Sequence, residues 1–137
     1  MERLLFLFVI AISAASPTYN TGLIRISNSL IAEENQFPYM ISLQQLSEIE
    51  SSTRGHRCGG ALITYQHVLT TASCTFNNDN GVFSPINHTK YRVFAGSVVL
   101  YNDTSDDRHR SIANITIHPM FDTSRPFNND IAVITVS

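Results

Sequence analysis

Between residues 39 and 136, short segments separated by polar clusters follow one another along the chain. Each segment is either apolar throughout or has hydrophobic and polar residues in turn, a pattern typical of β-structure. Six segments have strand character: residues 39–44, 58–64, 67–71, 91–96, 109–118 and 131–136. The last is a continuous apolar run, which suggests burial on both faces. Turn-forming residues gather at 51–55, 77–81, 102–107 and 122–130. The pattern predicts an antiparallel β-sandwich or barrel.

The first residues follow a different pattern. A basic start at Arg3 precedes an apolar run over residues 4–15, which ends in small residues. This order is typical of a secretory signal peptide, and the run is too short to span a bilayer as a helix. We predict a signal peptide over residues 1–15, with cleavage after Ala15 or Ser13, and a secreted, extracellular protein.

Secretion changes the interpretation of the two cysteines, Cys58 and Cys74. In an oxidising compartment they should pair, and closing a loop of about 16 residues should add about 3 kcal/mol of stability. Asn87, Asn102 and Asn114 each begin an N-x-Thr sequon, which fits a secreted glycoprotein. Asn102 lies in the most polar stretch and is the strongest candidate for glycosylation.

The composition narrows the possible partners. The chain has 137 residues, 43% of them hydrophobic and 15% charged, with a net charge of −2 and one lysine. These values fit one globular domain. The weak net acidity argues against nucleic acid and anionic membrane as partners, because both require clustered lysine and arginine.

Three blocks of the sequence carry a family resemblance. Residues 58–74 read C-G-G-A-L-I-T-Y-Q-H-V-L-T-T-A-S-C. This segment resembles the signature C-G-G-S-L-I-x-x-x-x-V-L-T-A-A-H-C of the trypsin-like serine proteases. Residues 25–44 resemble the activation junction and first strand. Residues 118–121 and 129–134 resemble the segment that delivers the triad aspartate. The blocks stand in the family's order and cover residues 25–137.

The resemblance implies an all-β fold: a six-stranded antiparallel Greek-key barrel, the first of the family's two barrels. It implies a propeptide over residues 16–25 and a trypsin-like domain over residues 26–137, with the second barrel absent from the chain. Activation cleavage would fall between Arg25 and Ile26. The family's I-V-G-G is here I-S-N-S, and asparagine and serine adopt the backbone angles of glycine less readily.

The same resemblance assigns the chemistry. In the family a serine attacks the peptide carbonyl, a histidine takes its proton, and a buried carboxylate orients the histidine. Asp130 matches the carboxylate, but Ser73 stands at the histidine position. A hydroxyl cannot serve as a general base near neutral pH. The nucleophile and oxyanion hole belong to the second barrel. We therefore predict a catalytically inactive homologue that acts by binding an extracellular protein: a protease, a protease substrate or an inhibitor.

Alternatives remain at this stage. The sequence could be a truncated record of a serine-type endopeptidase, a β-rich binding module outside the family, or an enzyme with an unconventional base. Candidates for such a base are His56, His67, His88, His109 and His118. We expect no metal or cofactor. Some relatives bind calcium in the loop that here holds Asp103, Asp106 and Asp107, but a solvated loop is the simpler interpretation.

Overall fold

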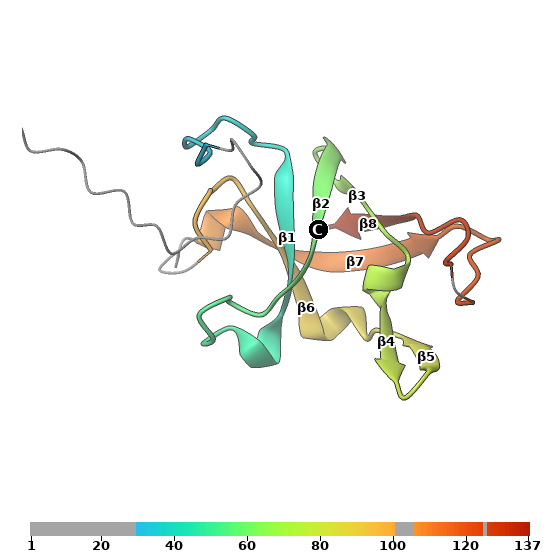
Figure 1. Cartoon of the computed structure of the whole chain (residues 1–137). Coiled ribbons are helices and arrows are strands. Elements are labelled where there is room, and N and C mark those ends of the chain that lie inside the picture. Colours follow the sequence, from blue (N-terminus) through green and yellow to red (C-terminus); the bar gives the residue numbers. More distant parts are fainter. Residues whose placement is uncertain (1–29, 101–105, 125) are drawn as a thin grey trace, which may run out of the picture. The chain divides into compact units, whose positions relative to one another are not determined.

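The computed structural model describes residues 30–100, 106–124 and 126–137 (Figure 1). Contacts divide the chain into two units, residues 1–30 and residues 31–137. All strands of the described residues lie in the second unit. The predicted signal peptide, the Arg25–Ile26 junction, Asn102 and Asp103 lie outside the described residues.

Six strands close into one antiparallel barrel. They are β1 (Met40–Gln45), β2 (His56–Thr64), β3 (His67–Thr70), β6 (Tyr91–Ala95), β7 (His109–Ile117) and β8 (Ala132–Val136). Their order around the barrel is β1-β2-β3-β8-β7-β6, so β1 pairs with both β2 and β6. All six predicted strands are confirmed, and the barrel is confirmed over the sandwich.

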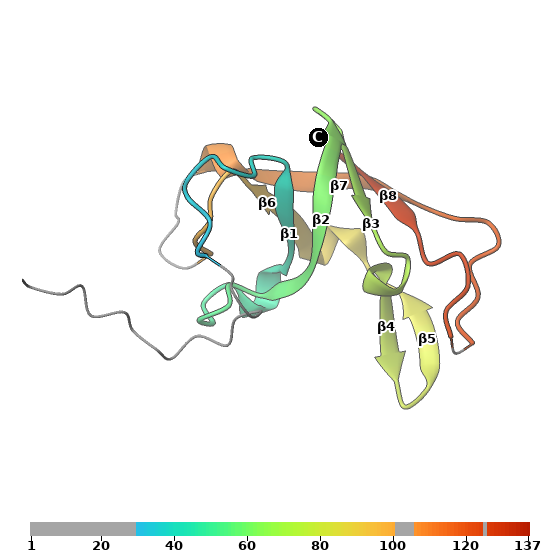
Figure 2. The same ribbon diagram turned by 45° about the horizontal axis from the view of Figure 1, so that its top comes forward.

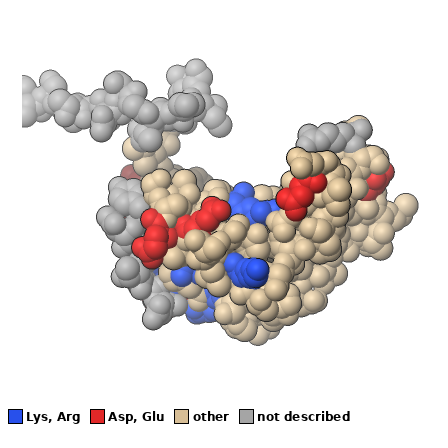
Figure 3. All heavy atoms as spheres, turned by 90° about the horizontal axis from the view of Figure 1, so that it is seen from below, with Lys and Arg blue, Asp and Glu red and all other residues tan. Residues whose placement is uncertain are grey.

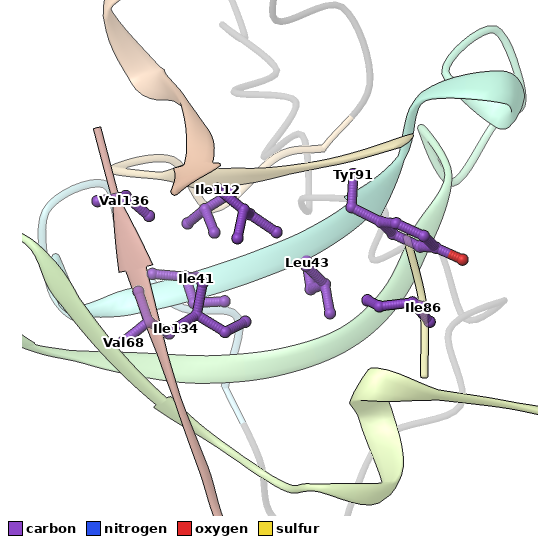
Figure 4. Close-up of a cluster of buried hydrophobic side chains, with 9 residues drawn as sticks. Ile41, Leu43, Val68, Ile86, Tyr91, Ile112, Ile134 and Val136 are labelled. Atoms are coloured by element: carbon purple, nitrogen blue, oxygen red, sulfur yellow. The ribbon is translucent and has the colours of Figure 1, made fainter. Parts of the chain in front are cut away.

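The barrel interior holds the apolar core, where Leu43, Val68 and Ile134 are fully buried (Figure 4). Along β8, Ala132, Ile134 and Val136 are buried, while the residues between them are half-buried. The expectation that residues 131–136 are buried on both faces is therefore wrong. A closed barrel gives each strand one interior face, so every second side chain points outward.

The structure contains a hairpin outside the barrel that the sequence pattern did not predict. β4 (Phe76–Asp79) pairs with β5 (Val82–Pro85) as a separate two-stranded sheet that lies beyond the barrel (Figure 2). Asn80 and Gly81 both have positive φ, 53° and 90°, as a two-residue hairpin turn requires. Residues 77–81 were expected to form a turn only. The strand before Asn80-Gly81 was not predicted, because its asparagine-rich sequence has the composition of a turn.

The described residues also form four single-turn 3-10 helices. They are η1 (Leu46–Glu48), η2 (Ser73–Thr75), η3 (His88–Lys90) and η4 (Asp106–Arg108). η2 begins shortly after β3 and carries Ser73, the residue that the sequence resemblance aligns with the triad histidine. The loop between β7 and β8 brings Asp130 to the same rim of the barrel.

Candidate functional site at the barrel rim

A disulfide fixes the segment that carries Ser73. Cys58 on β2 and Cys74 in η2 are bonded, with an S–S distance of 1.95 Å and a Cα–Cα distance of 6.1 Å. The predicted pairing is confirmed. Because β2 belongs to the closed barrel, this bond attaches η2 to the barrel sheet.

Ser73 and Asp130 meet at this rim, although 57 positions separate them in the sequence. The Ser73 hydroxyl donates to Asp130 Oδ2 at 2.8 Å, and the Ser73 backbone N–H donates to Asp130 Oδ1 at 2.6 Å. Both residues are half-buried. The hydroxyl also lies 3.2 Å from Thr71 Oγ1. Both carboxylate oxygens of Asp130 are therefore engaged by one residue.

Arg57 holds the backbone of η2 from the β2 side. Its Nε donates to the Cys74 carbonyl at 2.8 Å, and its Nη2 donates to the Phe76 carbonyl. The guanidinium carbon lies 5.7 Å from the centre of the Tyr91 ring, a cation–π distance. Arg57 was not among the site residues predicted from the sequence. The available signal was a basic residue directly before Cys58, followed by a small and apolar stretch over residues 59–63.

Four phenylalanines pack together beside the loop that carries Asp130. Ring centroids lie 5.4 Å apart for Phe76 and Phe121, 6.1 Å for Phe121 and Phe127, and 5.7 Å for Phe83 and Phe127. Aromatic pairs at these distances are favourable beyond the area they bury. The cluster joins the β4–β5 hairpin to the loop between β7 and β8. None of these four residues was predicted from the sequence to have a role.

Three of the five histidines considered as substitute bases have hydrogen-bond partners other than Asp130. His56 Nδ1 lies 2.7 Å from Ser42 Oγ, and His67 Nδ1 lies 2.7 Å from Thr64 Oγ1. His118 Nδ1 accepts from the Met120 backbone N–H at 3.2 Å. Within the described residues, the hydrogen bonds of Asp130 go to Ser73.

The arrangement therefore holds a carboxylate and a hydroxyl in contact, with no imidazole between them. A serine hydroxyl can donate to the carboxylate, but it cannot store a proton taken from another hydroxyl near neutral pH. Among the described residues, no three His, Cys, Asp or Glu side chains lie close enough to hold a metal ion.

One carboxyl in the same loop has a shifted pKa. The side-chain and backbone hydrogen bonds from Ser124 to Asp122 Oδ1, 2.7 and 2.8 Å long, lower the pKa of Asp122 below its usual range. Asp122 also bridges to Asn128 across the loop. These contacts shape the loop upstream of Asp130.

Two of the three sequons can be placed. Asn87 is exposed, and its Oδ1 accepts from the Thr89 backbone N–H at 3.1 Å and from Thr89 Oγ1 at 2.8 Å. Asn114 is exposed on β7, next to a register shift, and its Nδ2 lies 3.3 Å from Thr116 Oγ1. Both side chains are therefore accessible for attachment of a glycan.

Comparison with known proteins agrees with this geometry. The trypsin family model matches residues 26–137. A venom serine protease of Polistes dominula is 33% identical over 112 residues, which cover 80% of this chain and 35% of that protein. Chymotrypsin-C of Mus musculus is 33% identical over 132 residues, covering 93% of this chain and 43% of that protein.

Together the closed barrel, the disulfide and the position of Asp130 define the first barrel of a chymotrypsin-type fold. The chain belongs to the trypsin-like serine protease family. It spans less than half the length of these relatives. In the part of the chain that the structure describes, no helix is both long and apolar enough to cross a membrane.

Proposed function

We propose that this chain is a secreted, catalytically silent member of the trypsin-like family that acts by binding an extracellular protein. One observation carries the proposal: the Ser73 hydroxyl donates to Asp130 Oδ2 at 2.8 Å, where the family's mechanism needs an imidazole. The carboxylate is retained, but it orients a group that cannot accept a proton from a nucleophile.

The local contacts support a structural role for this pair. Ser73 donates to both oxygens of Asp130, Arg57 donates to the Cys74 carbonyl of η2, and the disulfide attaches η2 to β2. The rim is therefore well ordered without an imidazole, as a binding surface requires. The partner we propose is an active protease, a protease substrate or an inhibitor.

The proposed domain organisation follows the family. Residues 1–15 form the signal peptide, residues 16–25 a short propeptide, and residues 26–137 the trypsin-like domain. The start of the family match at Ile26, directly after Arg25, supports cleavage between these two residues. The exposed positions of Asn87 and Asn114 support glycosylation, and Asn102 completes the proposed set.

Catalysis is tested on the natural secreted protein with arginyl and other ester reporters. We expect hydrolysis no faster than the uncatalysed background, and no change in the Ser73→Ala variant. Turnover that disappears in Ser73→Ala would overturn the proposal and favour a serine endopeptidase.

Binding is tested by titrating the protein into an active trypsin-family protease, with cleavage of a protein substrate and of a short peptide reporter followed in parallel. A saturable change in either rate supports a regulatory role. If saturating protein changes neither rate and neither the protease nor its inhibitors are retained on the immobilised chain, the binding role is wrong.

A further inference from the structure

The turn of the β4–β5 hairpin carries two residues whose chemistry the proposed function does not use. Asn80-Gly81 is the only Asn-Gly dipeptide in the sequence, and both residues are exposed. In such a pair the glycine backbone nitrogen can attack the asparagine side-chain amide, because glycine has no side chain to shield that nitrogen. A Cβ atom built on Gly81 would have no atom of a non-adjacent residue within 4 Å. The fold therefore places nothing against the reacting glycine.

The hairpin is held less firmly than the barrel. β4 and β5 pair with each other as a two-stranded sheet outside the barrel, and a hairpin of two strands is only marginally stable by itself. Ring contacts of Phe76 with Phe121 and of Phe83 with Phe127 join the hairpin to the loop between β7 and β8. Local opening of such an element costs less free energy than opening of a closed core.

The closed turn restrains the reaction. The Gly81 N–H donates to Asn78 Oδ1 at 2.8 Å, and this is the proton that the nitrogen must lose before it attacks. Positive φ at Asn80 and Gly81, 53° and 90°, sets the backbone of the turn. Closing a ring between the Asn80 Cγ and the Gly81 nitrogen needs rotation about the Asn80 backbone. The reaction therefore depends on opening of the hairpin.

We propose that Asn80 is a modification site that deamidates spontaneously when the hairpin opens. The Gly81 nitrogen loses its proton to hydroxide and bonds to the Asn80 Cγ, the Cγ–Nδ2 bond breaks, and Nδ2 takes up protons from water and leaves as ammonia. Water then opens the resulting succinimide at either of its two carbonyls, which gives aspartate or isoaspartate. This inference does not depend on the proposed function.

The modification changes the charge and the backbone of the hairpin. Either product adds one negative charge, next to Asp79, to a chain whose net charge is −2. Seen from the side toward which the hairpin turn points, uncharged residues make up most of the surface (Figure 3). Isoaspartate also lengthens the turn, which disturbs the pairing of Asp79 with Val82. The modified protein should separate from its parent on an anion exchanger, and its hydrogen exchange should be faster over residues 76–85.

The test uses the full chain from a secretory host, incubated at neutral and at mildly alkaline pH. Ammonia release and peptide mapping follow the reaction, and fragmentation distinguishes isoaspartate from aspartate at residue 80. We expect both products, formed about tenfold faster for each pH unit, because the deprotonated fraction of a weakly acidic amide rises in that proportion. Asn78 is the internal control, since it is exposed on the same hairpin but precedes Asp79, and it should stay intact.

Variants separate the chemistry from the opening of the hairpin. Asn80→Gly removes the reacting amide but readily adopts positive φ, so residue 80 should release no ammonia. Asn78→Ala removes the acceptor of the Gly81 N–H, and deamidation should be about fivefold faster. Phe83→Ala removes one ring contact between the hairpin and the neighbouring loop, and deamidation should be about tenfold faster.

The matched control is Val82→Thr. Val82 is 68% exposed beside the turn, and threonine keeps its branched shape, so the rate should stay within about twofold. Thermal melting checks that each variant folds, and Asn78→Ala tests the role of opening if Phe83→Ala does not fold.

Four outcomes would overturn the proposal. The first is an intact Asn80 in the native protein over a period in which the urea-denatured chain is fully converted. The second is conversion of Asn78 as fast as that of Asn80. The third is aspartate without isoaspartate, which would indicate direct hydrolysis of the side chain. The fourth is an equal rate in Asn78→Ala, Phe83→Ala and Val82→Thr, which would show that opening of the hairpin does not control the reaction.

Discussion

The interior of the barrel and the rim around Ser73 differ in what holds them together. The interior is closed on every side and depends on apolar burial, with Leu43, Val68 and Ile134 fully covered. The rim depends on directed polar contacts: Ser73 with Asp130, Arg57 with two carbonyls, and one disulfide. A residue at the rim can therefore change without disturbing the core, provided that the new residue still donates to Asp130.

The sharpest contrast comes from the same substitution at a buried and an exposed site. Leu43→Ala should lower the free energy of unfolding by about 4 kcal/mol, because it leaves a cavity in a closed core. Leu46→Ala is the control, since Leu46 is 43% exposed, and should cost less than about 0.5 kcal/mol. Denaturant unfolding measures both. Equal losses would contradict the assignment of the core.

Removal of the disulfide tests how firmly the rim is tied to the barrel. The double variant Cys58→Ala, Cys74→Ala should lose about 3 kcal/mol, as expected for a closed loop of about 16 residues. Hydrogen exchange should speed up most in residues 71–76. Uniform acceleration over β6 and β7 would show that the bond stabilises the whole barrel instead.

Arg57 tests the polar attachment of η2. Arg57→Met keeps most of the apolar stem but leaves the Cys74 and Phe76 carbonyls without their donor, so we expect a loss of about 2 kcal/mol. The exposed Arg110→Gln serves as control and should cost less than about 0.5 kcal/mol. If the two variants unfold at the same denaturant concentration, Arg57 does not hold η2.

Ser73 itself should contribute less. Ser73→Ala removes the hydroxyl donor but keeps the backbone N–H on Asp130 Oδ1, so the expected loss is about 1 kcal/mol. Ser84→Ala, on the exposed β5, is the control and should be neutral. If Ser73→Ala raises the free energy of unfolding instead, the Ser73 hydroxyl does not stabilise the rim.

The smallest effect concerns Asp122. Because Ser124 lowers the pKa of Asp122, this interaction stabilises the loop above the unfolded-state pKa and is lost as pH falls through the folded-state pKa. Ser124→Ala should return the pKa of Asp122 toward its ordinary range, as measured by NMR titration of the carboxyl. An unchanged titration curve would show that the two hydrogen bonds do not hold in solution.

The barrel could be predicted because its six strands alternate or run apolar with clear breaks between them. The β4–β5 hairpin could not, because Asn77, Asn78 and Asp79 have the composition of a turn and gain their strand geometry only from pairing with β5. Likewise, the apolar run over residues 131–136 does not by itself indicate whether the outer face of β8 is covered. That depends on the closure of the whole sheet.

The candidate site was predictable in part. The sequence placed Ser73 beside Cys74 and aligned Asp130 with the triad carboxylate. The structure adds that one residue engages both carboxylate oxygens. Arg57 and the phenylalanine cluster were not predictable, because their roles arise from contacts between segments far apart in the chain, such as Phe83 with Phe127.

The most direct test of the central claim is labelling of the natural secreted protein with a fluorophosphonate probe, which reacts with serines activated by a general base. An active trypsin-family protease serves as positive control, and heat-denatured protein as background. We predict labelling at the background level at neutral pH. Stoichiometric labelling of the folded protein that disappears in Ser73→Ala would contradict the account.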